Sequence, residues 1–294
     1  MLYLIFSCLF FSARTLTNKE YTKDFSGTPS NMLFNAIGLS VTCIISILLG
    51  GVQVPSTRLL IIAAIFGLMF AGTVYFMLIC YAKGPLGLVA LIFNLCCVVP
   101  TMTGFILFKE PFSWMKLVGL LMFLGVVILS WQDGEAKDQG EKVYIPAKIW
   151  MPVTILTMLM NGSLSTMQNM AVHWCADESI NTFNFWAYLI GGSALWIATF
   201  VCKLKKGDFS PVIEKKRRFF SLALICGLLA SGGNIIIMYA LKVLPASLAY
   251  PLQSSIITLS LYLIGLFWYK EARTRLGIPM VVLGILSIVF LSMA

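Results

Sequence analysis

Charge is scarce in this sequence, and negative charge is the scarcest. Only 11% of the 294 residues are charged, with 12 Asp and Glu against 21 Lys and Arg. Soluble domains usually carry about 25% charged residues. Because 59% of the residues are hydrophobic and the mean hydropathy is +0.91, the composition leaves no room for a soluble domain and predicts an integral membrane protein.

Several chemical motifs are also missing. None of the eight cysteines forms a CxxC pair, there is a single histidine, and no ATP-binding motif is present. These absences argue against a metal centre, a disulfide framework and an ATP-driven pump. The basic residues, which give a net charge of +9, lie mostly in short loops where they match phospholipid headgroups rather than nucleic acid. We therefore expect no cofactor and no nucleic-acid partner.

Apolar stretches long enough to cross a bilayer recur along the whole chain. About 20 apolar residues are needed for one transmembrane helix, and ten such spans fit the sequence. They are Leu2 to Lys19, Met32 to Leu49, Leu59 to Tyr81, Leu86 to Phe108, Phe112 to Trp131, Ile149 to Trp174, Thr182 to Val201, Phe219 to Leu241, Ala246 to Tyr269 and Leu276 to Met293. The polar break at 132–147 divides them into five and five.

The two halves, residues 1–131 and 148–294, share an ordered set of residues. The matches are Ser12, Thr15, Asn18 and Phe34 with Ser163, Thr166, Asn169 and Phe185, 151 positions on; Gly67 and Gly72 with Gly227 and Gly232, 160 on; and Lys109-Glu110 with Lys270-Glu271, 161 on. A five-helix unit enters and leaves on opposite faces, so the second copy must be inverted. The sequence thus predicts an all-α membrane protein of two inverted five-helix repeats, an architecture typical of transporters.

Motifs at equivalent places in both halves resemble a known family. Tyr81-Ala82 and Tyr239-Ala240 lead into helices that end in Phe108-Lys109-Glu110 and Tyr269-Lys270-Glu271, and glycine-bearing helices follow, with Gly119 and Gly125 or Gly277 and Gly284. This pattern is similar to the EamA-like branch of the drug/metabolite transporter superfamily. The resemblance implies a multi-pass protein of a cell membrane, such as the bacterial inner membrane, that acts as a monomer or homodimer with the lipid bilayer and a small-molecule substrate as its partners. Leu261 stands where the first half has Pro100, so the second half departs from the pattern.

Arg14 is the charge that most invites a functional interpretation. Counted from Met1 at 1.5 Å per residue, Arg14 lies about 20 Å along the first span, where an unpaired charge costs roughly 2.5 to 3.5 kcal/mol. One interpretation is an interface anchor on a late or tilted helix. The other is a cation that binds a carboxylate or phosphate of the substrate.

Uncharged polar residues within the spans form a second group of candidates. Such side chains must hydrogen-bond to another helix or to something in a cavity, so each is either structural or substrate-binding. The substrate-binding candidates, besides Arg14, are Asn18, Asn94, Gln168, Asn169, Asn234, Tyr239, Tyr250, Gln253 and Ser254. Pro100 and Pro251 each free a helix carbonyl and are candidates for kinks or hinges.

These features favour a secondary transporter, an exporter of a small polar metabolite such as an amino acid or another carboxylate-bearing solute, that works by alternating access. All twelve acidic residues fall in loops or at span ends, which argues against proton-coupled export of cationic drugs. A multidrug exporter lined by aromatics such as Tyr75, Trp186 and Tyr250 remains the alternative within transport. A membrane-embedded enzyme or a non-transporting receptor is the alternative from a different class. Glu110 and Glu271 are predicted to anchor helix ends.

Overall fold

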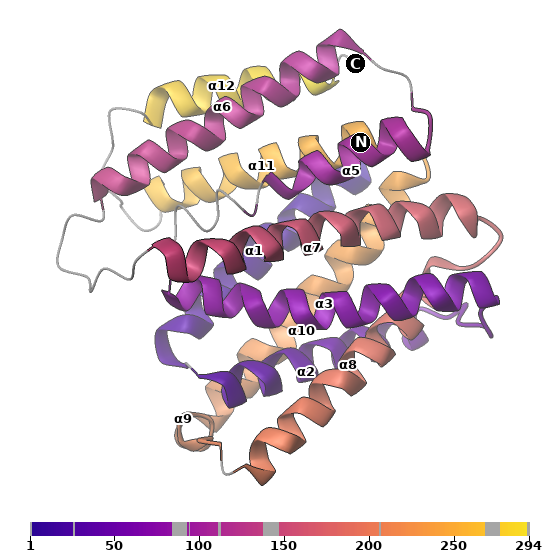
Figure 1. Ribbon diagram of the computed structural model, residues 1–294, viewed down its shortest axis with the longest axis vertical. Coiled ribbons are helices and arrows are strands. Elements are labelled where there is room, and N and C mark those ends of the chain that lie inside the picture. Colours follow the sequence, from indigo (N-terminus) through magenta and orange to yellow (C-terminus); the bar gives the residue numbers. More distant parts are fainter. Residues whose placement is uncertain are drawn as a thin grey trace. The chain divides into compact units, whose positions relative to one another are not determined.

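A computed structural model describes residues 2–25, 27–83, 93, 95–110, 113–137, 147–205, 207–267 and 277–292, and in these ranges all regular structure is helical (Figure 1). The elements are α1 (Leu2–Asp24), α2 (Thr28–Leu48), α3 (Thr57–Lys83), the 3-10 helix η1 (Leu95–Cys97), α5 (Val98–Leu107), α6 (Trp114–Lys137), α7 (Ala147–Trp174), α8 (Ile180–Leu204), α9 (Ser210–Glu214), α10 (Lys216–Leu241), α11 (Ala246–Phe267) and α12 (Gly277–Ser292). Four stretches, Thr28–Leu48, Thr57–Cys80, Ile180–Leu204 and Lys216–Leu241, have the length and composition to cross a membrane. These are the features of a helical membrane protein.

Each of the ten predicted segments contains a described helix, and three details differ from expectation. α6 continues to Lys137, six residues beyond its predicted end at Trp131 and into the predicted connecting loop. α1 continues for more than a turn beyond its predicted end, to Asp24, because its charged last turn forms ion pairs with α10. The polar loop before α10 holds the short helix α9, which Asp208 initiates by accepting hydrogen bonds from the backbone N–H and the hydroxyl of Ser210.

The described helices group into two compact units. Unit 1 comprises residues 1–82 and 167–242, and unit 2 comprises residues 83–166 and 243–294. Each unit therefore contains chain from both predicted halves, and the boundary between the units falls within α7. The predicted halves and the compact units are different divisions of the chain, because helices of one half take their neighbours from the other half.

Unit 1 is built on close helix crossings at glycine. α1 packs on α10, and α2 packs on both α8 and α10. A Cβ atom added to Gly67 of α3 would overlap the Ala187 carbonyl of α8, and one added to Gly227 of α10 would lie 2.8 Å from the Gly38 carbonyl of α2. The absence of a side chain at both positions lets the helix backbones approach closely.

Two aromatic clusters fill the interior of unit 1. Tyr21, Phe25, Phe34 and Phe219 lie together, with ring centroids 3.9 to 6.1 Å apart and no side chain more than 2% exposed. We call these four residues the first aromatic cluster. The second aromatic cluster comprises Phe66, Phe70, Phe183 and Tyr188, with centroids 5.2 to 5.9 Å apart.

In unit 2, α6 packs along α12, and α11 packs on α12 and α5 (Figure 1). The Ser287 hydroxyl of α12 donates to the Gly119 carbonyl of α6 at 2.9 Å. The first part of α7 is held against α5 by a hydrogen bond of 2.9 Å between the hydroxyls of Thr103 and Thr166. These hydroxyl contacts, one buried and one partly buried, satisfy polar groups in an otherwise apolar bundle.

Candidate functional site

Arg14 lies midway along α1 and has no acidic partner among the described residues. Twelve residues separate it from Leu2 and ten from Asp24, which places it about 18 Å and 15 Å from the two helix ends at 1.5 Å per residue. The side chain is half-buried, and its buried Nε atom has no hydrogen-bond partner. Its equivalent in the predicted second repeat, 151 positions on, is Ser165, so the charge belongs to one half alone.

The surroundings of Arg14 come from three other helices. The guanidinium carbon lies 5.7 Å from the centre of the Phe70 ring of α3, a cation–π contact. The guanidinium also interacts with the Tyr188 hydroxyl of α8 and the Cys226 thiol of α10. One turn along α1, the amide oxygen of Asn18 accepts a hydrogen bond from Cys226 at 3.3 Å. The cation therefore has a neutral, polarisable environment and no counter-ion among these neighbours.

Other buried polar groups of unit 1 also lack hydrogen-bond partners in the described part of the chain. The Tyr188 side chain is 1% exposed and its hydroxyl is unpartnered. Asn169 is equally buried, and neither its amide nitrogen nor its oxygen has a partner. Leaving such groups unpaired in an apolar interior costs free energy, so they are suited to hydrogen-bond a bound polar molecule.

Two further candidates in unit 1 pair with each other. The Gln168 amide donates to the Asn234 side-chain oxygen at 2.9 Å, and the Asn234 amide donates to the Ala230 carbonyl. Tyr239 is 38% exposed, stacks on Tyr3 and lies under Lys242. Gln168 and Asn234 thus join α7 to α10, and Tyr239 lies near one end of α10.

The remaining candidates with described positions belong to unit 2. The Tyr250 hydroxyl donates to the Ser165 carbonyl at 2.8 Å, Gln253 is buried and Ser254 is half-buried on α11. Pro100 lies inside α5 and Pro251 inside α11, and both are buried. Asn94 lies outside the described residues. Sequence reasoning missed Phe70, Tyr188 and Cys226, whose residue types alone give no sign that they surround a cation.

Glu110 anchors the start of α11. Its two carboxylate oxygens accept hydrogen bonds from the backbone N–H groups of Ala246 at 2.8 Å and Ser247 at 2.9 Å, and the carboxylate packs over Gly104. Lys109, with a φ of 51°, ends α5 in the left-handed conformation and turns the chain toward this contact. An anionic cap at a helix N-terminus is stabilising, so the predicted anchoring role of Glu110 is present in the structure. Glu271 lies outside the described residues.

We expect Glu110→Gln to lower the amount of folded protein while leaving the activity of each folded molecule intact. The glutamine amide nitrogen would face the backbone N–H of either Ala246 or Ser247, both of which now donate to the carboxylate. The lost hydrogen bond should lower the free energy of unfolding by about 0.5 to 2 kcal/mol. Folded protein in membranes, compared with the exposed-site control Glu214→Gln, measures the effect. Complete loss of activity in Glu110→Gln at normal abundance would contradict this role.

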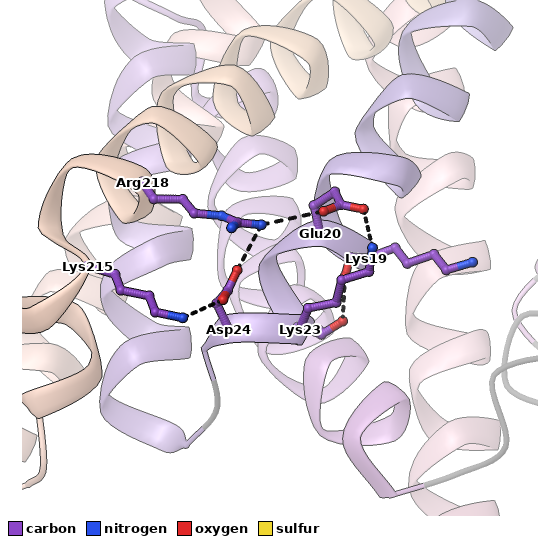
Figure 2. A network of polar contacts seen from close by, with 7 residues as sticks. Lys19, Glu20, Lys23, Asp24, Lys215 and Arg218 are labelled. Atoms are coloured by element: carbon purple, nitrogen blue, oxygen red, sulfur yellow. Dashed lines mark hydrogen bonds and ion pairs between the residues drawn. The ribbon is translucent and has the colours of Figure 1, made fainter. Parts of the chain in front are cut away.

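A network of charges joins the end of α1 to the start of α10 (Figure 2). Asp24 pairs with Lys215 at 2.6 Å and with Arg218 at 2.8 Å, while Glu20 pairs with Lys23 at 2.5 Å and with Arg218 at 3.5 Å. The hydrogen bond from Lys215, helped by the charges of Arg218 and Lys23, lowers the pKa of Asp24 below its ordinary value. Asp24 is therefore ionised at neutral pH, and protonation would remove its contribution only in strong acid.

A second carboxylate joins the α7–α8 turn to the start of α3. Glu178 accepts hydrogen bonds from the backbone N–H of Ser56 at 3.0 Å and from its hydroxyl at 2.6 Å. Arg58 donates to the Trp174 carbonyl at 3.5 Å. Cys175 interacts with both Glu178 and Arg58, and burial, reinforced by Glu178, raises the pKa of its thiol. These contacts fix α3 to the end of α7.

Comparisons with known proteins identify the fold but no family. No family model and no curated protein matches the sequence. Among solved structures 28 chains are similar, and one of them, described only as "Crystal structure of protein", matches with a TM-score of 0.70 at 14% identity. That match covers 99% of this chain and 96% of the other. The chain as a whole therefore adopts a fold seen in solved structures.

Proposed function

We propose that the chain is a secondary transporter of the EamA-like type, a multi-pass protein of ten spans in the bacterial inner membrane. It exports a small polar metabolite, an amino acid or another carboxylate-bearing solute, by alternating access. The observation that carries the proposal is a pair of equivalent glycine crossings: Gly67 against α8 and Gly227 against α2. They lie 160 positions apart and join equivalent helix pairs, as two inverted copies of one unit would require.

The helix pairs of both units support the same interpretation. α2 packs on α8, α5 on α11 and α6 on α12. Under the predicted repeat, each of these pairs would join a helix to its own counterpart, as a pseudo-two-fold relation within each unit requires. Inverted-repeat transporters bind their substrates between such equivalent helices.

Arg14 supports the substrate class. A guanidinium remains charged at any physiological pH and binds carboxylates through two parallel hydrogen bonds. All acidic residues of the sequence lie in loops or near helix ends, so a cationic drug would find a positive charge in this region and no opposite charge within the spans. Tyr75 and Trp186, two aromatics that would favour a multidrug exporter, bond instead to Thr28 and Gln53 at exposed positions.

A solute screen in proteoliposomes tests the proposed function. Liposomes that contain the purified protein are given gradients of carboxylates, amino acids, neutral sugars and lipophilic cations, and liposomes without protein are the control. We expect saturable flux of a carboxylate-bearing solute that unlabelled solute competes away. Flux of the cations alone would establish the multidrug alternative. No flux of any class by folded protein would favour a receptor or an enzyme.

A further inference from the structure

Two carboxylates of unit 1 each join two helices. We call the contacts of Asp24 with Lys215 and Arg218, with the adjoining ion pairs of Glu20, the Asp24 joint, and those of Glu178 with Ser56 the Glu178 joint. The two joints form an equivalent pair. Arg58 and Arg218 are 160 positions apart, the register that relates Gly67 to Gly227, so each arginine precedes its glycine crossing by nine residues. Asp24 is the last residue of the first helix of its half, and Glu178 follows the first helix of the other half by four residues. In both joints, a carboxylate at or just beyond the end of the first helix of one half holds the start of the third helix of the other half.

The Asp24 joint and the Glu178 joint lie at helix ends, and the candidate site around Arg14 lies between them. The Asp24 joint adjoins the first aromatic cluster, through Tyr21 and Phe25 on α1 and Phe219 on α10. The Glu178 joint adjoins the second aromatic cluster, through Phe183 on α8 and Phe66 on α3. Arg14 contacts Phe70 of the second cluster, and Asn18 lies one turn from Tyr21 of the first. A polar joint over an aromatic cluster thus stands on either side of Arg14.

The joints differ in chemistry. The Asp24 joint contains two carboxylates and three cations, and the side chains of Lys215 and Arg218 are each 51% exposed. Attraction between exposed charges weakens as salt is added. The Glu178 carboxylate binds the neutral backbone and hydroxyl groups of Ser56, a contact that depends less on ionic strength.

We propose that Asp24 and Glu178 are the gating residues of the transport cycle, one at each end of the path that leads to Arg14. This inference rests on the proposed alternating access, because inversion of the repeat places the two joints on opposite faces of the membrane. Opening one joint admits solute from that side while the other joint stays closed. Weakening either joint shifts the population toward the state that is open at its own end.

Hydrogen exchange on the full-length protein in nanodiscs, without any solute, tests the gating role. We expect Asp24→Asn to speed exchange roughly two- to fivefold at residues 18–25 and 216–226, the size expected for exposed ion pairs. The same variant should slow exchange at residues 56–66 and 178–183, because the two ends open alternately. Glu178→Gln should give the converse pattern. Glu214→Gln, which removes an exposed carboxylate next to Lys215 that has no hydrogen bond or ion pair among the described residues, should change neither end.

The reciprocal change separates a gate from a structural anchor. Faster exchange at the mutated end with no slowing at the opposite end would overturn the proposal, as would no change at either end. If a variant fails to fold, salt can be used on the unmodified protein instead. Raising KCl from 0.05 to 1 M should speed exchange at the Asp24 end alone. Equally faster exchange at both ends would also overturn the proposal. The exchange experiment contains no solute, so its result does not depend on transport. If exchange changes reciprocally but the liposome screen shows no flux, the proposed transport is contradicted and the gating role is not.

Discussion

Arg14→Gln is expected to weaken binding of the carboxylate-bearing substrate about 10- to 100-fold, which corresponds to the roughly 1.5 to 3 kcal/mol of a hydrogen bond to a charged group. Arg14→Lys should retain part of the affinity, because an ammonium keeps the charge but cannot form two parallel hydrogen bonds to one carboxylate. Both variants should insert into the membrane at least as well as the parent, since the substitution removes or preserves, but never adds, a buried charge.

Binding of the transported solute to purified variants by calorimetry measures this effect. Lys19→Gln is the matched control, because it removes a positive charge from the same helix, five residues toward the charged end of α1. Equal affinity of Arg14→Gln and the parent would show that Arg14 is only an interface anchor. The inference of an acidic substrate group would then be lost, while the transporter proposal would remain.

Gly191→Ala is expected to destabilise the protein by about 1 to 3 kcal/mol, the usual cost of forcing one extra carbon into a packed interior. A Cβ atom at this position would overlap the Gly67 carbonyl of α3 and lie 3.0 Å from its carbon. Neither atom can move without displacing the backbone of α3. The two helices would have to separate, and with them Phe66 and Phe183 of the second aromatic cluster.

The adjacent residue supplies the control. A Cβ atom on Gly192, which is buried on the same helix, would meet only the Leu39 Cβ at 3.5 Å, an ordinary contact. Thermal unfolding followed with a thiol-reactive dye is suitable because six of the eight free cysteines are buried. We expect a lower Tm for Gly191→Ala and little change for Gly192→Ala. Equal effects of the two substitutions would contradict a specific glycine crossing.

The sequence was most informative where hydropathy and small residues decide structure. A helix lies at each predicted span because about 20 apolar residues can satisfy their backbone in lipid only as a helix. Gly67 and Gly227 could be paired by their 160-residue spacing, and the structure shows that both close crossings require a missing side chain. Glu110 could be recognised as an anchor because it follows a helix end. That the ten spans form an inverted repeat remains a prediction supported by the helix pairing.

The candidate site was predictable only in part. Arg14 stood out because it is a charge in an apolar span, whereas Phe70 and Tyr188 are common residues whose role depends on helix rotation and neighbours. The end of α1 was placed too early because Glu20 and Asp24 read as a loop, although α10 supplies their counter-ions. The equivalence of Arg58 and Arg218 was present in the 160-residue register and could have been found from the sequence.

The interleaving of the two units has a consequence for synthesis. Unit 1 contains both α1 and α10, which ends at Leu241 and is therefore synthesised much later than α1. When α1 is synthesised, neither Tyr188 nor Cys226 has been made, so the guanidinium of Arg14 must wait for these neighbours from later in the chain. A chain arrested before α8 would hold this charge without the Tyr188 hydroxyl and the Cys226 thiol beside it.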